Sequence, residues 1–342
     1  MRLGLQLGYS GPTMVDHTDT VVEAERLGYD SIWTAEAYGS DAVTPLVWYG
    51  ARTERIRLGT AIMQMPARTP AMTASTIATL DALSGGRVIC GLGLSGPQVV
   101  EGFHGVPYGK PLTRSREYVE VVRRFLRREE PVAFAGKEIR LPADGPGSHG
   151  LGKPLRLILH PIRPDIPIYL GAEGPRNLEL AGEIADGWIT LFNSPTHMQE
   201  LYLEPIERGL AKSGRTMADF DVAASVMVVP GADWRACAAM VKPMIALYIG
   251  GMGAKDRNFH FDAVCRFGYE EAAITIQDHY LAGDKMAAMT AVPDELCDEI
   301  ALLGPSERLA ERLEPWRKAG VDDLLIMNSG VETLRTMAEI CL

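Results

Sequence analysis

The segment from Thr73 to Gly93 constrains the fold of this chain more than any other part of the sequence. Its first half places apolar residues three and four positions apart, which is typical of a helix lying with one face against a sheet. Gly85 and Gly86 follow, and glycine accepts the left-handed backbone conformation that ends a helix. Val88 to Gly93 is then an apolar run without polar alternation, as in a parallel strand covered on both faces. The segment predicts one helix–turn–strand step, with functional groups just past the carboxyl end of the strand.

Short apolar runs alternate with amphipathic helical segments along the whole chain. This alternation fits either a closed (β/α)8 barrel or a doubly wound sheet, and eight units with a last helix at the C-terminus favour the barrel. We therefore predict the α/β fold class, as a (β/α)8 TIM barrel with loop insertions, in one domain over residues 1–342. The expected strands are Leu3–Leu7, Ser31–Trp33, Ile56–Met63, Val88–Gly93, Ile168–Leu170, Gly187–Thr190, Val222–Val229 and Leu324–Met327.

The segments between the strands include three helices with clear ends: Met14–Leu27 before Gly28, Pro305–Ala319 before Gly320, and Val331–Ile340 after the last strand. Two stretches, about 131–165 and 250–293, do not follow the alternation of strands and helices and are rich in Pro, Gly, Met, His and aromatic residues. In a barrel such insertions usually lie at the mouth of the active site, and we expect both there.

Composition excludes several classes of function. The 34 Lys and Arg against 44 Asp and Glu give a net charge of -10, which argues against nucleic acid as the main partner. The five cysteines are odd in number, far apart and never in Cys-x-x-Cys spacing, so neither a disulfide framework nor a zinc site is indicated. No apolar run is long enough for a membrane span, and nothing resembles a secretory leader. We expect a cytoplasmic protein with no metal and no membrane partner.

A glycine motif follows the strand of the opening segment. Gly91, Gly93 and Gly96 match Gly-x-Gly-x-x-Gly, the dinucleotide fingerprint. A true fingerprint opens a long helix in the first βα unit, whereas here a short turn begins at Pro97 in the fourth unit. The alternative is a loop that lets a flat ligand approach the backbone closely.

Two further strand-to-helix loops are candidates for ligand binding. The run from Gly59 to Pro70 ends in polar residues and Arg68, which could hold an anion or could be merely solvated. The turn from Gly171 to Asn177 carries two glycines and a proline suited to the first helical turn. Free amides at such a helix start bind phosphate, although a glycine turn chosen for its shape is an equal alternative.

Candidate catalytic residues are Glu36, at the catalytic end of the second strand, and Glu101 and His104 in the loop after the fourth. Each is also compatible with an ordinary solvated loop residue. The seven histidines form no metal-binding spacing, and no His-Glu-x-x-His or Gly-x-Ser-x-Gly element occurs. Metal-dependent and serine hydrolysis therefore receive little support.

Several segments in order resemble the luciferase-like monooxygenase superfamily, and more closely its branch that uses the deazaflavin coenzyme F420, including methylenetetrahydromethanopterin reductases. The likeness covers nearly the whole chain. The segments that carry it are Asp30–Glu36, Gly59–Gln64, Thr73–Gly93, Ser95–Gly102, and Gly171–Arg176 with Leu180–Trp188.

The resemblance implies a TIM barrel whose strand ends hold the deazaflavin ring. Glu36 matches an acidic residue near the ring, and Gln64 matches a polar residue that can reach its edge. Ala61 and Ile62 match a dipeptide that forms a bulge under the ring through a non-proline cis bond. The Gly171–Gly174 turn matches a phosphate-contacting turn. The implied cofactor-binding residues are Glu36, Thr60, Ala61, Ile62, Gln64, Gly93, Leu94, Ser95, Gly171, Ala172, Glu173 and Gly174.

The resemblance also implies an activity: hydride transfer between the reduced deazaflavin C5 and an electron-poor C=C, C=N or C=O group of a small organic substrate. Many relatives have a histidine after strand two, whereas this chain has Ala37 after Glu36. A proton must then come from Glu36, Glu101, His104, a tyrosine such as Tyr9 or Tyr38, or water. The alternatives are an FMN-dependent luciferase-like monooxygenase and a non-catalytic flavin-binding protein.

A homodimer is implied as well, because relatives bury helices around strands two and three against a partner. The helix from Ala71 to Leu83 could serve, and burial against its own barrel is the alternative. The loop from Gly250 to Phe261 mixes aromatic, basic and polar groups, and we expect it to shape the substrate pocket. The sequence does not identify the substrate.

Overall fold

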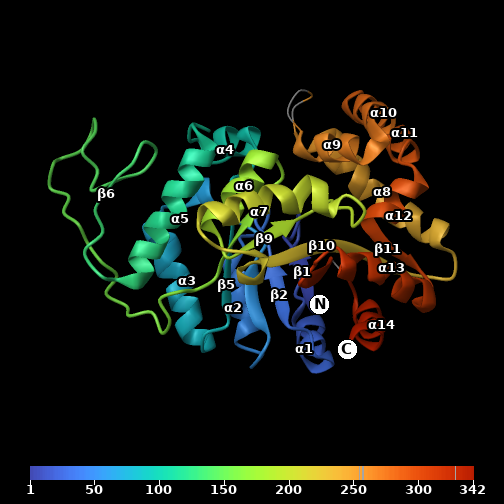
Figure 1. Ribbon diagram of the computed structural model, residues 1–342, viewed down its shortest axis with the longest axis horizontal. Coiled ribbons are helices and arrows are strands. Elements are labelled where there is room, and N and C mark those ends of the chain that lie inside the picture. Colours follow the sequence, from blue (N-terminus) through green and yellow to red (C-terminus); the bar gives the residue numbers. More distant parts are fainter. Residues whose placement is uncertain (254, 256–257, 328) are drawn as a thin grey trace.

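Eight parallel strands close into a barrel in the computed structural model, which describes residues 1–342 except 254, 256–257 and 328 (Figure 1). Each strand pairs with its neighbour along the chain, and β10 pairs with both β9 and β12 to complete the ring. The predicted (β/α)8 TIM barrel is confirmed. The barrel strands are β1 (Arg2–Gly8), β2 (Ser31–Thr34), β3 (Arg57–Thr60), β5 (Val88–Gly93), β8 (Ile168–Gly171), β9 (Gly187–Thr190), β10 (Asp221–Pro230) and β12 (Asp323–Met327).

Helices surround the barrel on its outer side (Figure 1). Gly85 and Gly86 both adopt positive φ and end α3, as the sequence predicts. The helices are α1 (Thr18–Leu27), α2 (Val43–Gly50), α3 (Pro70–Ser84), α4 (Pro97–Gly102), α5 (Pro111–Arg127), α6 (Pro175–Ile184), α7 (Glu204–Lys212), α8 (Trp234–Gly251), α9 (Phe259–Val264), α10 (Glu270–Leu281), α11 (Lys285–Thr290), α12 (Asp294–Ile300), α13 (Ser306–Lys318) and α14 (Val331–Cys341). None of the helices in the described part of the chain is long and apolar enough to cross a membrane.

The largest differences from the predicted elements concern the third strand, the first helix and one additional strand. The third strand is split, because a cis peptide bond between Ala61 and Ile62 separates β3 from the short β4 (Met63–Gln64). Helix α1 begins at Thr18 rather than Met14, since the Asp16 carboxylate accepts hydrogen bonds from the Thr18 amide and hydroxyl in a local turn. An additional strand, β11 (Ala301–Gly304), pairs with the carboxyl half of β10 on the outside of the ring.

A small apolar core fills the interior of the barrel. It is centred on Trp33 and Tyr169, whose ring centroids are 5.9 Å apart. Glycine makes room for these rings, since a Cβ at Gly59 would lie 2.2 Å from the Trp33 ring. Ala61 and Ile62 pack on this interior cluster. The cis bulge therefore stands directly above the filled centre of the barrel.

The two insertions lie at different places. The segment 250–293 forms α9, α10 and α11, and His260 of α9 packs against Phe192, just after β9, at the carboxyl ends of the strands as expected. The segment 131–165 leads from the end of α5 to the start of β8 and forms the small hairpin β6 (Phe134–Ala135) and β7 (Arg140–Leu141). Its Arg163 donates to Asp81 and to the Val88 carbonyl at the start of β5. The ends of this insertion join α5 to β8 at the amino ends of the strands, whereas its hairpin reaches the first half of α5, where the amides of Lys137, Glu138 and Ile139 donate to Glu117. The expectation that this insertion lies at the mouth stays a prediction.

An ion-pair network closes the opposite, amino-terminal end of the barrel. Arg2 donates to both carboxylate oxygens of the fully buried Asp323 at 2.7 Å, and to Asp221 at 2.7 Å. Arg57 adds a contact of 3.2 Å to Asp323, and the Tyr169 hydroxyl donates to Asp221 from inside the barrel. Burial raises the pKa of Asp323, and the two guanidinium groups oppose that shift. The network joins the starts of β1, β3, β10 and β12.

Replacing Asp323 with Asn should lower the free energy of unfolding by about 2 kcal/mol, because the fully buried Asp323 position loses its charge and two partly exposed guanidinium groups then face an amide donor. Urea denaturation followed by circular dichroism measures the change. Asp144→Asn is the matched control: its ion pair with Arg140 is exposed on both sides, and we expect a change within about 0.5 kcal/mol. Equal effects of the two substitutions would contradict this role for the network.

Candidate active site

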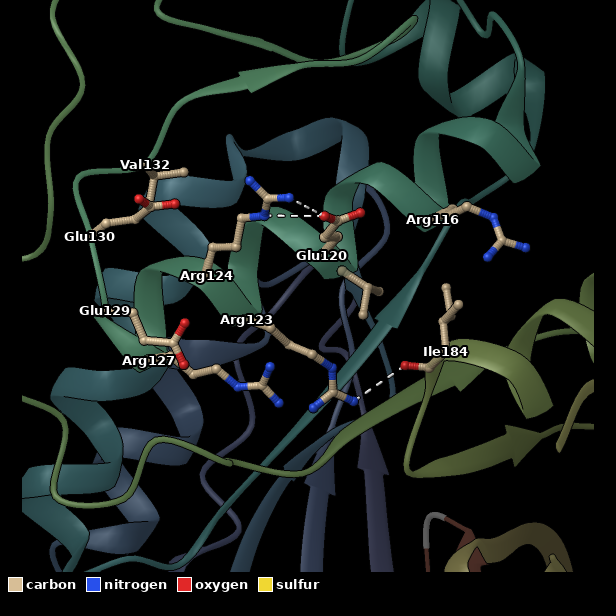
Figure 2. Close-up of a pocket in the computed structure, with 10 residues that line it drawn as sticks. Arg116, Glu120, Arg123, Arg124, Arg127, Glu129, Glu130, Val132 and Ile184 are labelled. Carbon is tan, nitrogen blue, oxygen red and sulfur yellow. Dashed lines mark hydrogen bonds and ion pairs between the residues drawn. The ribbon is translucent and has the colours of Figure 1, made fainter. Parts of the chain in front are cut away.

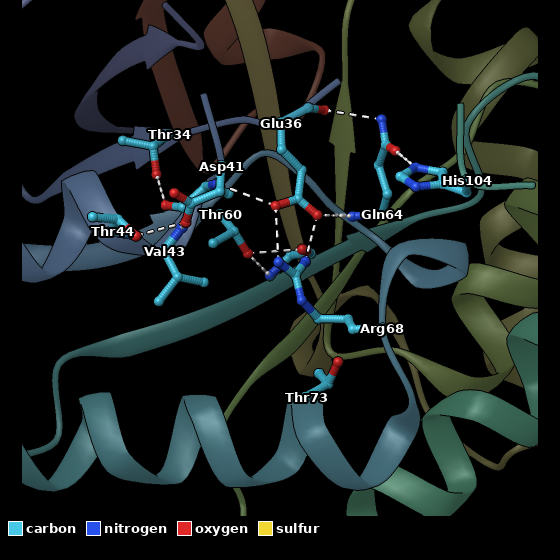
Figure 3. Close-up of polar contacts among 12 residues, drawn as sticks. Thr34, Glu36, Asp41, Val43, Thr44, Thr60, Gln64, Arg68, Thr73 and His104 are labelled. Atoms are coloured by element: carbon cyan, nitrogen blue, oxygen red, sulfur yellow. Dashed lines mark hydrogen bonds and ion pairs between the residues drawn. The ribbon is translucent and has the colours of Figure 1, made fainter. Parts of the chain in front are cut away.

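The carboxyl ends of β2, β3 and β5 bring four polar side chains together (Figure 3). Glu36 follows β2, Gln64 lies on β4, Arg68 precedes α3, and His104 follows α4. Two of the three predicted catalytic residues, Glu36 and His104, therefore belong to one cluster, which they share with Gln64 and Arg68.

Glu36 holds the segment after β3 in place. Its Oε1 accepts from the Gln64 amide at 2.8 Å, and its Oε2 accepts from the Ala42 amide at 3.1 Å. Arg68 donates to both carboxylate oxygens. The Glu36 backbone amide also donates to the Ile62 carbonyl at 3.3 Å. The Glu36 side chain, only 7% exposed, accordingly clamps the bulge and the turn behind it.

These contacts define what Glu36 and Arg68 can do. Four hydrogen bonds occupy the acceptor positions of the Glu36 carboxylate, so its clear structural role is to orient the loop. Arg68 is neither free for an anion nor merely solvated, because its guanidinium is paired with Glu36 and its carbonyl accepts from the Tyr118 hydroxyl at 3.0 Å. The catalytic role of Glu36 stays a prediction.

Gln64 connects Glu36 to His104. Its Nε2 donates to the Glu36 carbonyl at 3.1 Å, and its Oε1 contacts His104 Nε2. Gln64 is 3% exposed and His104 is half-buried. The amide retains one hydrogen and one oxygen lone pair for a ligand, so the predicted contact with a ring edge remains compatible with the geometry.

The other proton-carrier candidates lie apart from this cluster. Glu101 is exposed on α4, and its carboxylate accepts from the Tyr108 amide at 3.2 Å. Tyr38 is 57% exposed, whereas Tyr9 is half-buried, and burial raises the pKa of the Tyr9 hydroxyl, with Tyr38 adding to the shift. No hydrogen bond between described residues joins any of these three to Gln64 or His104.

The glycines after β5 make contact with protein atoms. A Cβ at Gly91 would lie 1.7 Å from the Thr60 carbonyl oxygen, and one at Gly93 would lie 2.7 Å from the Ile62 side chain. The Thr60 hydroxyl donates to the Gly91 carbonyl and accepts from the Gly91 amide. The resemblance implies that Gly93 lies beside the ring of a bound cofactor. In the structure, the atoms nearest to the Gly93 Cα on that side belong to Ile62.

The remainder of the glycine motif departs from a dinucleotide fingerprint. Ser95 has a φ of 61°, and Leu94 is half-buried. Gly96 begins α4, which contains only six residues. A helix this short supplies little dipole for a pyrophosphate, so the structure does not favour the dinucleotide interpretation of the motif. The first two glycines make room for protein atoms, and the approach of a ligand to this loop stays a prediction.

The turn from Gly171 to Gly174 joins β8 to α6. Trp188 Nε1 donates to the Ala172 carbonyl at 2.8 Å, and Ile62 lies over Gly171. Gly174 is the N-cap of α6, with no side chain capping the helix, and a Cβ there would meet nothing within 4 Å. The start of α6 is thus open to an approaching group, as an anion-binding turn requires.

Glu173 in this turn is a buried carboxyl group. Its Oε2 is buried without a hydrogen-bond partner. Burial raises the pKa of Glu173 to about 8, an effect that Arg266 and the Leu191 amide partly offset. Glu173 therefore carries its proton at neutral pH, and a neutral acid beside the turn does not repel an anion.

An aromatic group that the sequence analysis did not single out covers the same end of the barrel. Phe192, Tyr248 and His260 lie edge to face, with centroids 4.9–5.3 Å apart. Burial lowers the pKa of His260 to about 4, so its imidazole is neutral, and its Nδ1 is buried without a partner. His260 falls in the loop expected to shape the pocket, of which residues 254, 256 and 257 lie outside the described residues. In the sequence, the Phe-His-Phe run at 259–261 was the signal that could have identified His260 as part of an aromatic group.

A hollow of about 530 Å³ lies elsewhere, on the outer face of α5 (Figure 2). Four arginines line it, and each is committed to a partner: Arg116 to Glu183, Arg123 to Asp186, Arg124 to Glu120 and Arg127 to Asp165. Since each arginine that lines the hollow is paired, none of them is free to bind an anionic ligand. The hollow also lies away from the polar cluster at the carboxyl ends of the strands. No group of three or more His, Cys, Asp or Glu side chains within the described ranges could hold a metal ion.

The closed (β/α)8 barrel defines a TIM-barrel protein, and its polar cluster lies at the carboxyl ends of the strands, where proteins of this fold usually have their active sites. The chain belongs to the luciferase-like monooxygenase family, whose model matches residues 1–323. A Mycobacterium tuberculosis protein named "Putative coenzyme F420-dependent oxidoreductase Rv3520c" is 46% identical over 343 residues, with 99% of each chain covered.

Archaeal reductases are similar in both sequence and structure. The 5,10-methylenetetrahydromethanopterin reductase of Archaeoglobus fulgidus is 29% identical over 88% of this chain and 86% of its own. The solved coenzyme F420 dependent tetrahydromethanopterin reductase from Methanopyrus kandleri superposes with a TM-score of 0.82 at 26% identity, covering 99% of this chain and 97% of that one. The resemblance drawn from the sequence is confirmed at the level of the family and of its F420-dependent relatives.

Replacing Glu173 with Gln should change how stability depends on pH. The folded protein holds the Glu173 proton up to about pH 8, whereas the unfolded chain releases it near 4.5, so rising pH between these values favours unfolding. The wild type should lose up to about 1.4 kcal/mol per pH unit relative to Glu173→Gln in this range. Urea unfolding at a series of pH values measures the slope, with the exposed Glu130→Gln as control. Parallel pH curves for wild type and Glu173→Gln would contradict the assignment.

Proposed function

We propose that the protein is a coenzyme F420-dependent oxidoreductase that transfers a hydride between the deazaflavin and an electron-poor C=C, C=N or C=O group of a small organic substrate. The observation that carries the proposal is the polar cluster at the carboxyl ends of the strands, in which Glu36 holds the segment from Ile62 to Gln64 above the filled barrel. Ile62 also packs over Gly171, in the turn that leads to the uncapped helix start at Gly174. Two of the relatives are named as F420-dependent enzymes, which supports the proposal.

The described residues fit such a group. Ala61 and Ile62 would support the flat ring, and the remaining amide hydrogen and lone pair of Gln64 would reach its edge. The turn at Ala172, Glu173 and Gly174 would take the phosphate, because Gly174 opens on unfilled space and Glu173 is neutral. Thr60, Gly93 and Gly171 would act indirectly, since they are packed against Gly91 or Ile62. Leu94 and Ser95 would border the ring from the loop after β5.

A reduced deazaflavin supplies a hydride at C5 when bound. The protein residues would orient a substrate against that position, keep water away, and move the compensating proton. His104 is the candidate best placed for the proton, because it is half-buried in the cluster while Glu36 is paired and Glu101 is exposed. Phe192 and Tyr248 would form an apolar wall beside the substrate.

Titration with F420 and FMN side by side tests the cofactor. We expect saturable binding of F420, and binding of FMN at least about tenfold weaker, which corresponds to about 1.4 kcal/mol. Tryptophan fluorescence measures both, and an anaerobic screen of enone, imine and ketone substrates with reduced F420 then tests hydride transfer. Tight FMN binding without F420 binding would instead favour an FMN-dependent monooxygenase.

Gly174→Ala provides a matched test of the binding turn. The added Cβ meets nothing in the free protein, so folding should be preserved while the approach of the phosphate is blocked and F420 affinity falls about tenfold or more. Gly330→Ala is the control, because Gly330 is the N-cap of α14 with a similar φ of -80° and equally open surroundings. Equal F420 affinity in both variants would remove the turn from the proposed site.

We also propose that two copies of the chain associate through the faces of α2 and α3. Helix α3 buries Ala74, Ile77 and Ala78 against its own barrel, yet it leaves Met72 57% exposed. The neighbouring α2 exposes Val47 and Trp48, the latter at 50%. Large apolar side chains gathered on adjacent helices are typical of a protein interface.

Trp48→Glu should convert the dimer into a monomer, because the substitution replaces a large exposed apolar side chain of the proposed interface with a charge. Sedimentation velocity at micromolar concentration measures the state of association. Met240→Glu is the control, since Met240 is 70% exposed on α8, away from α2 and α3. A monomeric wild type would refute the proposed dimer.

A further inference from the structure

The side-chain nitrogen of Gln64 lies beside a group that can only accept a hydrogen bond. Its Nε2 lies 3.1 Å from the backbone carbonyl oxygen of Glu36. A carbonyl oxygen can only accept a hydrogen bond, so the NH2 group of Gln64 must face it. The carbonyl oxygen of the amide, Oε1, is thereby turned toward His104.

This orientation fixes the state of the imidazole. An amide oxygen accepts and cannot donate, so His104 Nε2 must carry a hydrogen to bond with Gln64 Oε1. In a neutral histidine the other nitrogen, Nδ1, is then unprotonated. No hydrogen bond from the described residues reaches Nδ1.

We propose that Gln64 is a positioning residue that holds His104 in its Nε2–H tautomer and leaves Nδ1 as the atom through which this imidazole exchanges a proton with a substrate. The exchange with substrate rests on the proposed function. The tautomer rests only on the contacts around Gln64, so the two can fail separately.

The amide cannot turn over without losing both of its bonds. After a flip, Oε1 would face the Glu36 carbonyl and the NH2 group would face the Nε2 hydrogen of His104. The main chain of Gln64 is itself anchored, because its amide donates to Glu36 Oε1 at 2.8 Å and Glu36 is paired with Arg68. β4 also pairs with β5, Gln64 opposite Gly93. The orientation of Gln64 is therefore dictated by the same clamp that holds the bulge.

The charged groups near His104 are few. The Glu36–Arg68 ion pair lies beyond Gln64, and Glu101 is exposed on the preceding helix. The ring of Phe103 packs edge-on against the imidazole, with centroids 5.2 Å apart. Neither arginine nor carboxylate contacts His104 directly, so Gln64 is its one hydrogen-bonding side chain among the described residues.

Nitrogen-15 NMR of the histidine side chains tests the proposal on the protein without cofactor. His104 is assigned by the signal lost in His104→Gln. In the neutral form of His104 we expect the hydrogen on Nε2, and a mixed tautomer in Gln64→Met, which has similar length but no amide oxygen to accept that hydrogen. A wild-type His104 protonated on Nδ1, or the same signals in wild type and Gln64→Met, would overturn the proposal.

A second variant measures the influence of Gln64 on proton exchange. In Gln64→Glu a carboxylate stands beside Nε2, and the NMR titration midpoint of His104 should move up by about 1 pH unit. Gln98→Glu, an equal change of charge at an exposed site on α4, should leave the midpoint in place. If the protein binds F420, the alkaline limb of the pH profile for hydride transfer should move with the midpoint. An unmoved midpoint in Gln64→Glu would contradict the contact. A moved midpoint with an unmoved pH profile would contradict the substrate role alone.

Discussion

The arrangement of the barrel mouth depends on one carboxylate. Glu36 receives hydrogen bonds from two backbone amides and a guanidinium, and its main chain bonds to Ile62 and Gln64. Through these contacts it fixes the cis bulge, the course of the chain toward α3 and the orientation of the Gln64 amide. A single charged group that is only 7% exposed can do this because its charge is balanced by Arg68, from the loop between β4 and α3.

The two ends of the barrel differ in their polar groups: ion pairs close the amino end, and the candidate site lies at the carboxyl end. The amino end is closed by Arg2, Arg57 and Asp323, which tie together strands distant in sequence. At the carboxyl end, some buried polar atoms have no hydrogen-bond partner among the described residues, such as Glu173 Oε2 and His260 Nδ1. Unsatisfied buried polar atoms cost free energy, and they are tolerated at a functional end because the other end keeps the ring closed.

The sequence predicted the barrel well because most strands are short apolar runs and because several helices end at a glycine, such as Gly28 and Gly85. It also brought Glu36 and His104 to one end, since strand ends meet there. It did not predict the pairing of Glu36 with Arg68, because such a contact spans 32 positions and carries no periodic signal. The strand β11 and the return of residues 131–165 to the amino end depend on packing between distant segments, which local pattern does not encode.

Charge at the mouth differs from charge over the whole chain. The chain has a net charge of -10, yet Glu36 is neutralised by Arg68, and burial keeps Glu173 protonated at neutral pH. His260 is neutral for the same reason, because an apolar aromatic setting disfavours its charged form. These three groups therefore place no uncompensated negative charge at the carboxyl end of the barrel, although the chain as a whole is acidic.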